Sequence, residues 1–147
     1  SPIGPLIGRR YNRERMARTF GNIFGPQTQP DEHELDAFWR MIEFNQGPRI
    51  MHLLIRYMAD RRVHRDRWVA AMQATRLPLR VIDGAVDPVS GAHMVERYRQ
   101  LIPDPDTVLL PHIGHYPQVE APELVLEHYL AFREQRVDQP AETTTPA

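Results

Sequence analysis

The spacing of apolar and polar positions divides the chain into a helical first half and a second half in which strands and helices alternate. Over residues 1 to about 75, apolar side chains recur at helical spacing, and glycine and proline interrupt the pattern. Four helices are expected. The first covers about residues 6–20, and the second starts at Asp31, with Glu34 as its capping-box partner. The third starts at Pro48, and the fourth covers about residues 65–74. The pattern predicts no strand in this half.

The apolar periodicity changes in the second half of the chain. The predicted elements are a strand over residues 77–82, a helix that Ser90 caps and that ends near Leu101, a strand over residues 107–110, and a helix from Pro122 to about Arg136. Because a helix connects the two strands, they should be parallel neighbours. Residues 138–147, rich in proline and threonine, are predicted to form a disordered tail.

The predicted sheet is incomplete. Two parallel strands do not make a stable sheet, because parallel sheets have more strands and are covered on both faces. The chain begins at Ser1, without a methionine, within a region predicted to be helical. We therefore expect the remaining strands of the core to lie upstream of Ser1 and to be the protein partner of this chain. Residues 1–147 in isolation should be inactive and poorly stable, since the first strand has an unpaired edge.

Composition excludes several classes of function. The chain has no cysteine, which excludes disulfide frameworks and thiol catalysis. All 18 basic residues are arginine and are interleaved with 19 acidic residues, for a net charge of −1, so no nucleic-acid partner is expected. No apolar stretch reaches the roughly 18 residues of a membrane span, and membrane association of the complete protein stays open. A bacterial source, which exclusive use of arginine suggests, would favour a cytoplasmic location.

Two polar residues follow the ends of the predicted strands. Asp87 lies just beyond the first strand, and His115 lies a few residues beyond the second. Open α/β sheets build their sites at the carboxyl edge, and the crossover returns the chain to that edge. A carboxylate bound to Nδ1–H of a histidine fixes the tautomer and leaves Nε2 free as a general base. We therefore predict Asp87 as catalytic acid and His115 as catalytic base, with Asp83 as the competing acid.

Residues 77–136 resemble the last strand–helix–strand–helix of the α/β-hydrolase family. His115-Tyr116-Pro117, followed by Glu120-Ala121-Pro122, is similar to the end motif of that family, and acid before histidine is its chain order. The segments that extend the resemblance to the branch of haloalkane dehalogenases and epoxide hydrolases are residues 24–30, 67–68, 79–89 and 112–118. The resemblance implies an α/β fold, with a helical cap domain over residues 1–75 and the end of the hydrolase core over residues 76–137.

The resemblance also implies the chemistry. In that branch an aspartate on a strand–turn–helix elbow attacks the substrate, and the histidine activates water to hydrolyse the enzyme ester. No Gly-x-Ser-x-Gly elbow precedes Asp87 in this chain, and Ser90-Gly91 follows the acid and lacks the first glycine. We therefore expect the nucleophile outside this chain. The implied substrate is a small or lipophilic haloalkane, epoxide or ester, and no cofactor is implied.

Several residues outside this pair have predicted supporting roles. Trp39 and Tyr57 are candidates for substrate binding between the cap and the sheet, although their helical spacing is also typical of packing residues. Tyr11 and Tyr57 are the cap tyrosines that could assist the opening of an epoxide ring. Glu120 is expected to cap the last helix and to support the His115 loop.

Alternatives to this interpretation remain. His112 and His115 have a spacing that could suit a metal, but the loop lacks acidic partners, so no metal is expected. The chain could belong to a hydrolase-like interaction protein that has lost catalysis, or be a truncated fragment with no function of its own. The presence of both Asp87 and His115 argues against an interaction protein, because binding alone requires neither.

Overall fold

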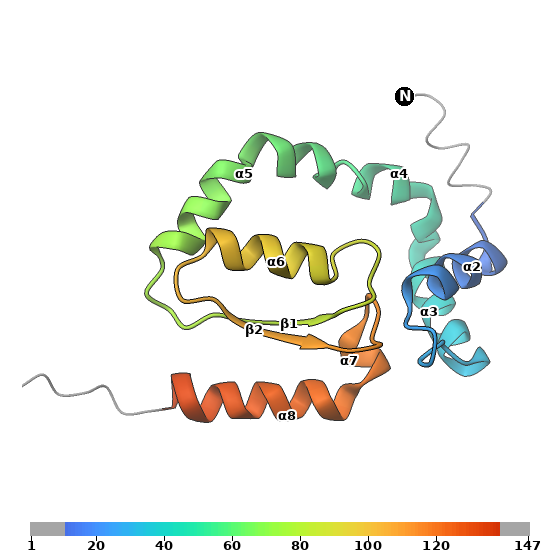
Figure 1. Cartoon of the computed structure of the whole chain (residues 1–147). Coiled ribbons are helices and arrows are strands. Elements are labelled where there is room, and N and C mark those ends of the chain that lie inside the picture. Colours follow the sequence, from blue (N-terminus) through green and yellow to red (C-terminus); the bar gives the residue numbers. More distant parts are fainter. Residues whose placement is uncertain (1–10, 139–147) are drawn as a thin grey trace, which may run out of the picture.

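The computed structural model describes residues 11–138, in which helices cover both faces of a two-stranded sheet (Figure 1). The elements in chain order are α2 (Arg13–Ile23), α3 (Glu32–Glu43), the 3-10 helix η1 (Phe44–Ile50), α4 (Met51–Leu54), α5 (Tyr57–Ala74), β1 (Arg80–Gly84), α6 (Ala92–Leu101), β2 (Asp106–Leu110), α7 (Pro117–Glu120), α8 (Pro122–Phe132) and the π-helix η2 (Arg133–Val137). The expected helix start at residues 6–10, and the expected tail from residue 139 onward, lie outside the described residues. The predicted boundaries between cap, core and tail stay predictions.

The capping box predicted for the second helix is present. Asp31 accepts a hydrogen bond from the backbone N–H of Glu34 at 2.8 Å, and the Glu34 carboxylate accepts one from the N–H of Asp31 at 3.0 Å. The preceding helix α2 continues through Gly21 to Ile23, beyond its predicted end. A single glycine costs a helix only about 1 kcal/mol, so Gly21 alone does not end it.

Two predicted helix starts are wrong. Pro48 does not begin a helix but lies inside η1, where Asn45 and Gln46 have left-handed φ angles of 50° and 60°. α-Helical geometry resumes only at Met51. Helix α5 begins at Tyr57, earlier than predicted, because no glycine or proline interrupts the residues that follow.

The strands β1 and β2 pair in parallel, which confirms the prediction. Their register runs from Arg80 opposite Asp106 to Gly84 opposite Leu110. The strand β1 begins later than predicted, because Pro78 has no N–H to contribute to a ladder. Arg80 and Asp106 form an ion pair of 2.9 Å whose side chains are largely buried. Helix α6 lies over one face of the sheet and α8 over the other (Figure 1).

The helices that follow the strands differ in part from expectation. The N-cap of α6 is Gly91, and no side chain caps this helix, so the predicted cap at Ser90 is wrong. Helix α8 begins at Pro122, as predicted, but ends at Phe132, where η2 continues the chain. The single turn α7, between the His115 loop and α8, is absent from the predicted elements.

The main core lies in the helical half and reaches the loop after β2. Its buried residues are Met16, Phe20, Phe24 and Leu35. The ring of Tyr116, in the loop that follows β2, lies 5.6 Å from that of Phe20 and 5.4 Å from that of Phe24. The helical half is therefore packed against the carboxyl edge of the sheet.

Within residues 11–138 the sheet has only two strands, so each strand has an unpaired edge. Most residues of β1 and β2 are half-buried, and each strand has one partner. Large apolar side chains are exposed on η1 to α5 and on α8, among them Phe44, Leu54, Ile55, Val63, Leu126 and Leu130. In the same part of the chain, no helix is long and apolar enough to cross a membrane.

Candidate active site

The turn after β1 is hydrogen-bonded to the loop after β2. The N–H of Ala85 donates to the carbonyl of Leu110 at 3.0 Å, and that of Val86 donates to the carbonyl of Ile113 at 3.1 Å. These bonds continue the contact between the two segments beyond the last paired residues. Asp87, the next residue of the turn, is thereby held beside the loop that carries His115.

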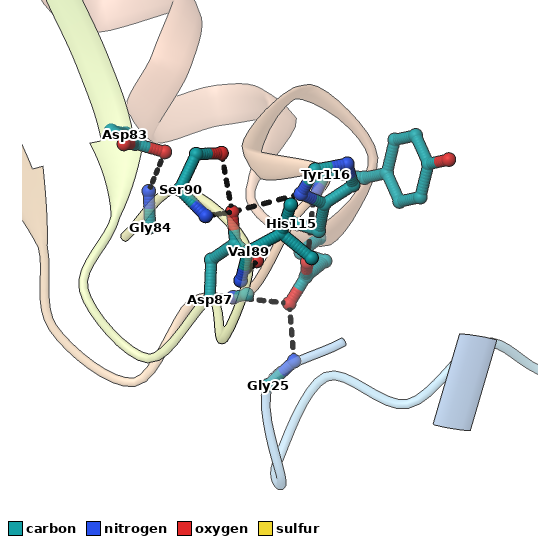
Figure 2. A network of polar contacts seen from close by, with 10 residues as sticks. Gly25, Asp83, Gly84, Asp87, Val89, Ser90, His115 and Tyr116 are labelled. Carbon is teal, nitrogen blue, oxygen red and sulfur yellow. Dashed lines mark hydrogen bonds and ion pairs between the residues drawn. The ribbon is translucent and has the colours of Figure 1, made fainter. Parts of the chain in front are cut away.

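The Asp87 side chain is buried, and both of its oxygens accept hydrogen bonds (Figure 2). Oδ1 accepts from the N–H of Val89 at 2.8 Å. Oδ2 accepts from the N–H and the hydroxyl of Ser90, at 2.9 and 2.7 Å, and contacts Nδ1 of His115 at 2.8 Å. Burial raises the pKa of Asp87, but the hydrogen bond from His115 and those from the turn together hold it below its usual value. Asp87 is therefore ionised near neutral pH.

The imidazole of His115 is held so that one nitrogen is available. An ionised carboxylate only accepts hydrogen bonds, so Nδ1 carries a proton and Nε2 is the basic nitrogen of the neutral ring. Within residues 11–138 no hydrogen bond involves Nε2, and about 30% of the side chain is exposed. The ring lies edge-on to that of Tyr116, with centroids 4.9 Å apart. This arrangement can accept a proton from a water or hydroxyl at Nε2.

The Glu120 carboxylate holds the His115 loop from the other side. Its Oε2 accepts from the N–H of Gly114 at 2.8 Å, and its Oε1 accepts from the N–H of Tyr116 at 3.0 Å. Oε2 also accepts from the N–H of Gly25 at 2.7 Å and from the hydroxyl of Thr28 at 2.6 Å. The predicted support of the loop is therefore present. The predicted cap is not, because the N-cap of α8 is Ala121 and no side chain caps that helix.

The competing acid, Asp83, forms no hydrogen bond or ion pair with His115 in the described residues. Its Oδ1 accepts only from the N–H of Gly84, at 2.9 Å, and its buried Oδ2 has no partner within residues 11–138. Burial and the nearby charge of Asp87 raise the pKa of Asp83. Of the two candidate acids, Asp87 alone has the geometry that orients the imidazole.

The predicted substrate-binding residues lie apart from this pair. Trp39 is half-buried in α3, and its ring lies 6.2 Å from that of Tyr11, beside the helical core. Tyr57 is half-exposed at the start of α5, where the guanidinium of Arg61 lies 6.0 Å from its ring. Within the described part of the chain, no hydrogen bond or ring contact joins Trp39 or Tyr57 to His115. Their substrate-binding role stays a prediction.

A cavity of about 370 Å³ lies at the other end of the sheet, near the starts of the strands. Its lining includes Met72, Leu77, Tyr98, Ile102 and Arg136, and it contains none of the predicted site residues. Among residues 11–138, no group of three or more histidine, aspartate or glutamate side chains is arranged to hold a metal.

Sequence reasoning missed three partners of the site. Ser90, predicted as a helix cap, instead supports Asp87. Gly25 and Thr28 bind the Glu120 carboxylate from a segment more than 90 residues away in sequence, at separations of 95 and 92 residues. No local sequence pattern predicts contacts between segments so far apart. The only available signal was the turn chemistry of Asp87-Pro88-Val89-Ser90, in which an aspartate commonly accepts from the N–H groups that follow it.

Comparison with known proteins identifies the class of this fold, although no family model matches the chain. "Putative hydrolase LipZ" of Mycobacterium tuberculosis (strain ATCC 25618 / H37Rv) is 40% identical over 132 residues, which cover 90% of this chain and 46% of LipZ. The mesoderm-specific transcript protein of Mus musculus is 34% identical over 132 residues, or 88% of this chain and 39% of that protein. The crystal structure of a serine hydrolase involved in carbazole degradation, the CarC enzyme, matches with a TM-score of 0.65 at 19% identity, over 85% of this chain and 48% of that one.

These comparisons confirm the predicted resemblance to the α/β-hydrolase family and the predicted fold class. The chain resembles the α/β-hydrolase superfamily, and its described part has the fold of the C-terminal part of an α/β-hydrolase. The chain spans less than half the length of the curated relatives it matches.

Substitution of Gly114 by alanine should disrupt the packing of the His115 loop. A Cβ there would lie 2.3 Å from the carbonyl oxygen of Ile23 and 2.5 Å from the backbone nitrogen of Gly25. Both are backbone atoms, so moving either of them away would be energetically costly. We expect Gly114→Ala to lower the free energy of unfolding of the complete gene product by about 1–3 kcal/mol, measured by urea denaturation. In the control Gly21→Ala, the added Cβ would lie 3.4 Å from Oε1 at the end of the Gln29 side chain. This substitution should raise the free energy of unfolding by up to about 1 kcal/mol. Equal effects of the two substitutions would contradict this packing.

The stability should depend on pH through Asp87. Its pKa in the folded protein lies below the ordinary value of 3.8, so its stabilisation is present above about pH 4 and is lost as the pH falls through the folded-state pKa. Relative to wild type, Asp87→Asn should therefore lower the free energy of unfolding most above about pH 4, and less at more acidic pH. Urea denaturation of both proteins across this range measures the difference. A difference that does not change with pH would show that the Asp87 charge is not stabilised by the fold.

Proposed function

We propose that the complete gene product is a hydrolase that acts on a small or lipophilic substrate through a covalent enzyme ester, with Asp87 and His115 as its acid and base. The observation that carries this proposal is the 2.8 Å contact between the buried, ionised Asp87 and Nδ1 of His115. The name of the hydrolase relative supports the reaction class. The nucleophile is supplied by residues outside this chain.

His115 acts as the general base of the reaction. Nε2 takes a proton from water as the water oxygen attacks the ester carbonyl, the ester C–O bond breaks, and the departing oxygen takes the proton back from Nε2. The neutral imidazole and the nucleophile are thereby restored, and the carboxylic acid that forms loses its proton to solvent. Asp87 keeps the imidazole in the tautomer that frees Nε2, and its charge stabilises the imidazolium that forms. Side chains and water suffice for this sequence of steps, so the proposal includes no cofactor.

The identity of the nucleophile separates two versions of the reaction. An aspartate nucleophile would displace a halide or open an epoxide at carbon and form an alkyl ester, as the resemblance to the dehalogenase and epoxide hydrolase branch implies. A serine nucleophile would attack an ester carbonyl, expel an alcohol and form an acyl ester. In both versions His115 activates the water that releases the product.

The remainder of the hydrolase core is the proposed partner of this chain. The half-buried strands of the sheet support this proposal, because each strand has one partner and parallel sheets normally have more strands. The exposed apolar residues of η1 to α5 and of α8 support it as well. Without that remainder and its nucleophile, residues 1–147 should have no hydrolytic activity.

Loss of either member of the pair should abolish turnover. Asp87→Asn and His115→Ala in the complete gene product should each lower kcat by up to about 10⁴-fold, the scale of the corresponding aspartate in a serine-protease triad. Turnover of a panel of haloalkanes, epoxides and esters measures the effect, and circular dichroism checks that each variant folds. Asp60→Asn and His33→Ala change exposed residues and should leave turnover unchanged. Normal turnover in the Asp87 or His115 variant would refute the catalytic assignment.

Mass spectrometry of His115→Gln should identify the nucleophile. An aspartate forms its ester without a base, and only the hydrolysis needs His115, so an ester adduct should accumulate on the variant. A serine needs His115 to take its proton in the first step, so no adduct should form. We expect the adduct, on a peptide outside this chain. Its absence, with turnover lost, would instead support a serine nucleophile.

A further inference from the structure

We propose that Glu120 is a positioning residue that sets the location of His115 by fastening its loop to the segment between α2 and α3. This inference rests on the proposed function, since it assigns Glu120 a role in the reaction of His115. Glu120 forms no hydrogen bond with the imidazole in the described residues, and it binds the backbone on each side of His115 instead.

Three consecutive N–H groups of the loop are held from outside it. Those of Gly114 and Tyr116 donate to the two oxygens of Glu120, at 2.8 and 3.0 Å. Between them, the N–H of His115 donates to the carbonyl of Ile23 at 2.8 Å. The backbone on each side of His115 is therefore fixed by one carboxylate, and the backbone of His115 itself is fixed by the last residue of α2.

The same carboxylate binds the segment that follows α2. The N–H of Gly25 and the hydroxyl of Thr28 donate to Oε2, at 2.7 and 2.6 Å, beside the N–H of Gly114. Figure 2 shows the Gly25 segment approaching the network from the side opposite Ser90. A displacement of the helical half would therefore be transmitted to the His115 loop through Glu120.

The backbones of the two segments are also in direct contact. A Cβ on Gly25 would lie 2.1 Å from the carbonyl oxygen of His112, and one on Gly114 would lie 2.3 Å from that of Ile23. Because both positions are glycine, the chains approach closely enough for a single carboxylate to reach donors on both. The Glu120 carboxylate and its donors on Gly25, Thr28, Gly114 and Tyr116 thus form one connection between the two closely packed segments, which we call the joint.

This joint requires a charged carboxylate. Burial raises the pKa of Glu120, but hydrogen bonds from the Thr28 hydroxyl and from the three N–H groups lower it below its usual value, so Glu120 is ionised near neutral pH. Both oxygens face donors only. A glutamine would have to direct its NH₂ group at one or more of those donors, whichever way the amide is turned.

The test compares variants of the complete gene product that differ in this joint. Glu120→Gln and Thr28→Val should each lower kcat, by about 10- to 100-fold for Glu120→Gln and by less for Thr28→Val, with little change in KM. Thr28→Ser keeps the hydroxyl and should restore kcat. Glu123→Gln is the matched control, because Glu123 is exposed in the first turn of α8.

Proton NMR gives a readout that does not depend on activity. We expect the hydrogen bond to Asp87 to shift the Nδ1–H resonance of His115 downfield. This resonance should broaden or move in Glu120→Gln and Thr28→Val, and should stay in place in Thr28→Ser and Glu123→Gln. If Glu120→Gln fails to fold, the Thr28 pair still provides the test.

Either of two outcomes would overturn the proposal. In the first, Glu120→Gln and Thr28→Val melt at a lower temperature but keep the kcat and the His115 Nδ1–H resonance of the wild type. This result would show that the role of Glu120 is purely structural. An unmoved resonance in Thr28→Val, with kcat equal to that of Thr28→Ser, would do the same. If instead the resonance moves but His115→Ala retains turnover, the joint stands and the proposed catalytic function fails.

Discussion

Parallel pairing of β1 with β2 is the constraint on which the arrangement of this site depends. Because the strands run in the same direction, the chain leaves both of them at one edge of the sheet, and neighbouring parallel strands lie only about 4.8 Å apart. The turn after β1 and the loop after β2 then continue to bond through their backbones. The contact between Asp87 and His115 follows from that pairing, since each side chain lies a few residues beyond the end of its strand.

Three buried or half-buried carboxyl groups of this edge differ in their hydrogen bonds, and their pKa values differ accordingly. Asp87 and Glu120 are each surrounded by donors, which outweigh the effect of burial and hold the pKa of each below its usual value. Asp83 has one donor and one buried oxygen without a partner in the described residues, and its pKa is raised. An acidic residue near a histidine is therefore insufficient to define an acid–base pair. The donors around its oxygens decide whether it stays charged where it is buried.

Packing and hydrogen bonding join the helical half to the site in a consistent way. Tyr116 inserts its ring among the aromatic residues of the helical core, while the neighbouring His115 projects toward Asp87. Successive residues of one loop thus serve the core and the site. Substitutions in the helical core should consequently change the position of the imidazole through Tyr116, whose ring contacts both the core and His115.

The sequence by itself determined the alternation of strands and helices, the parallel order of the strands, and the two residues at their ends, because periodicity and chain order are local properties. The capping box at Asp31 and Glu34 was predictable for the same reason. The contact of Ser90 with Asp87 spans only three residues, and local turn chemistry could have indicated it. Only the tertiary structure decided that Glu120 binds Gly25 and Thr28 instead of capping α8. These contacts depend on how segments far apart in sequence meet in space. A buried carboxylate takes whichever donors that meeting provides, and no local pattern specifies them.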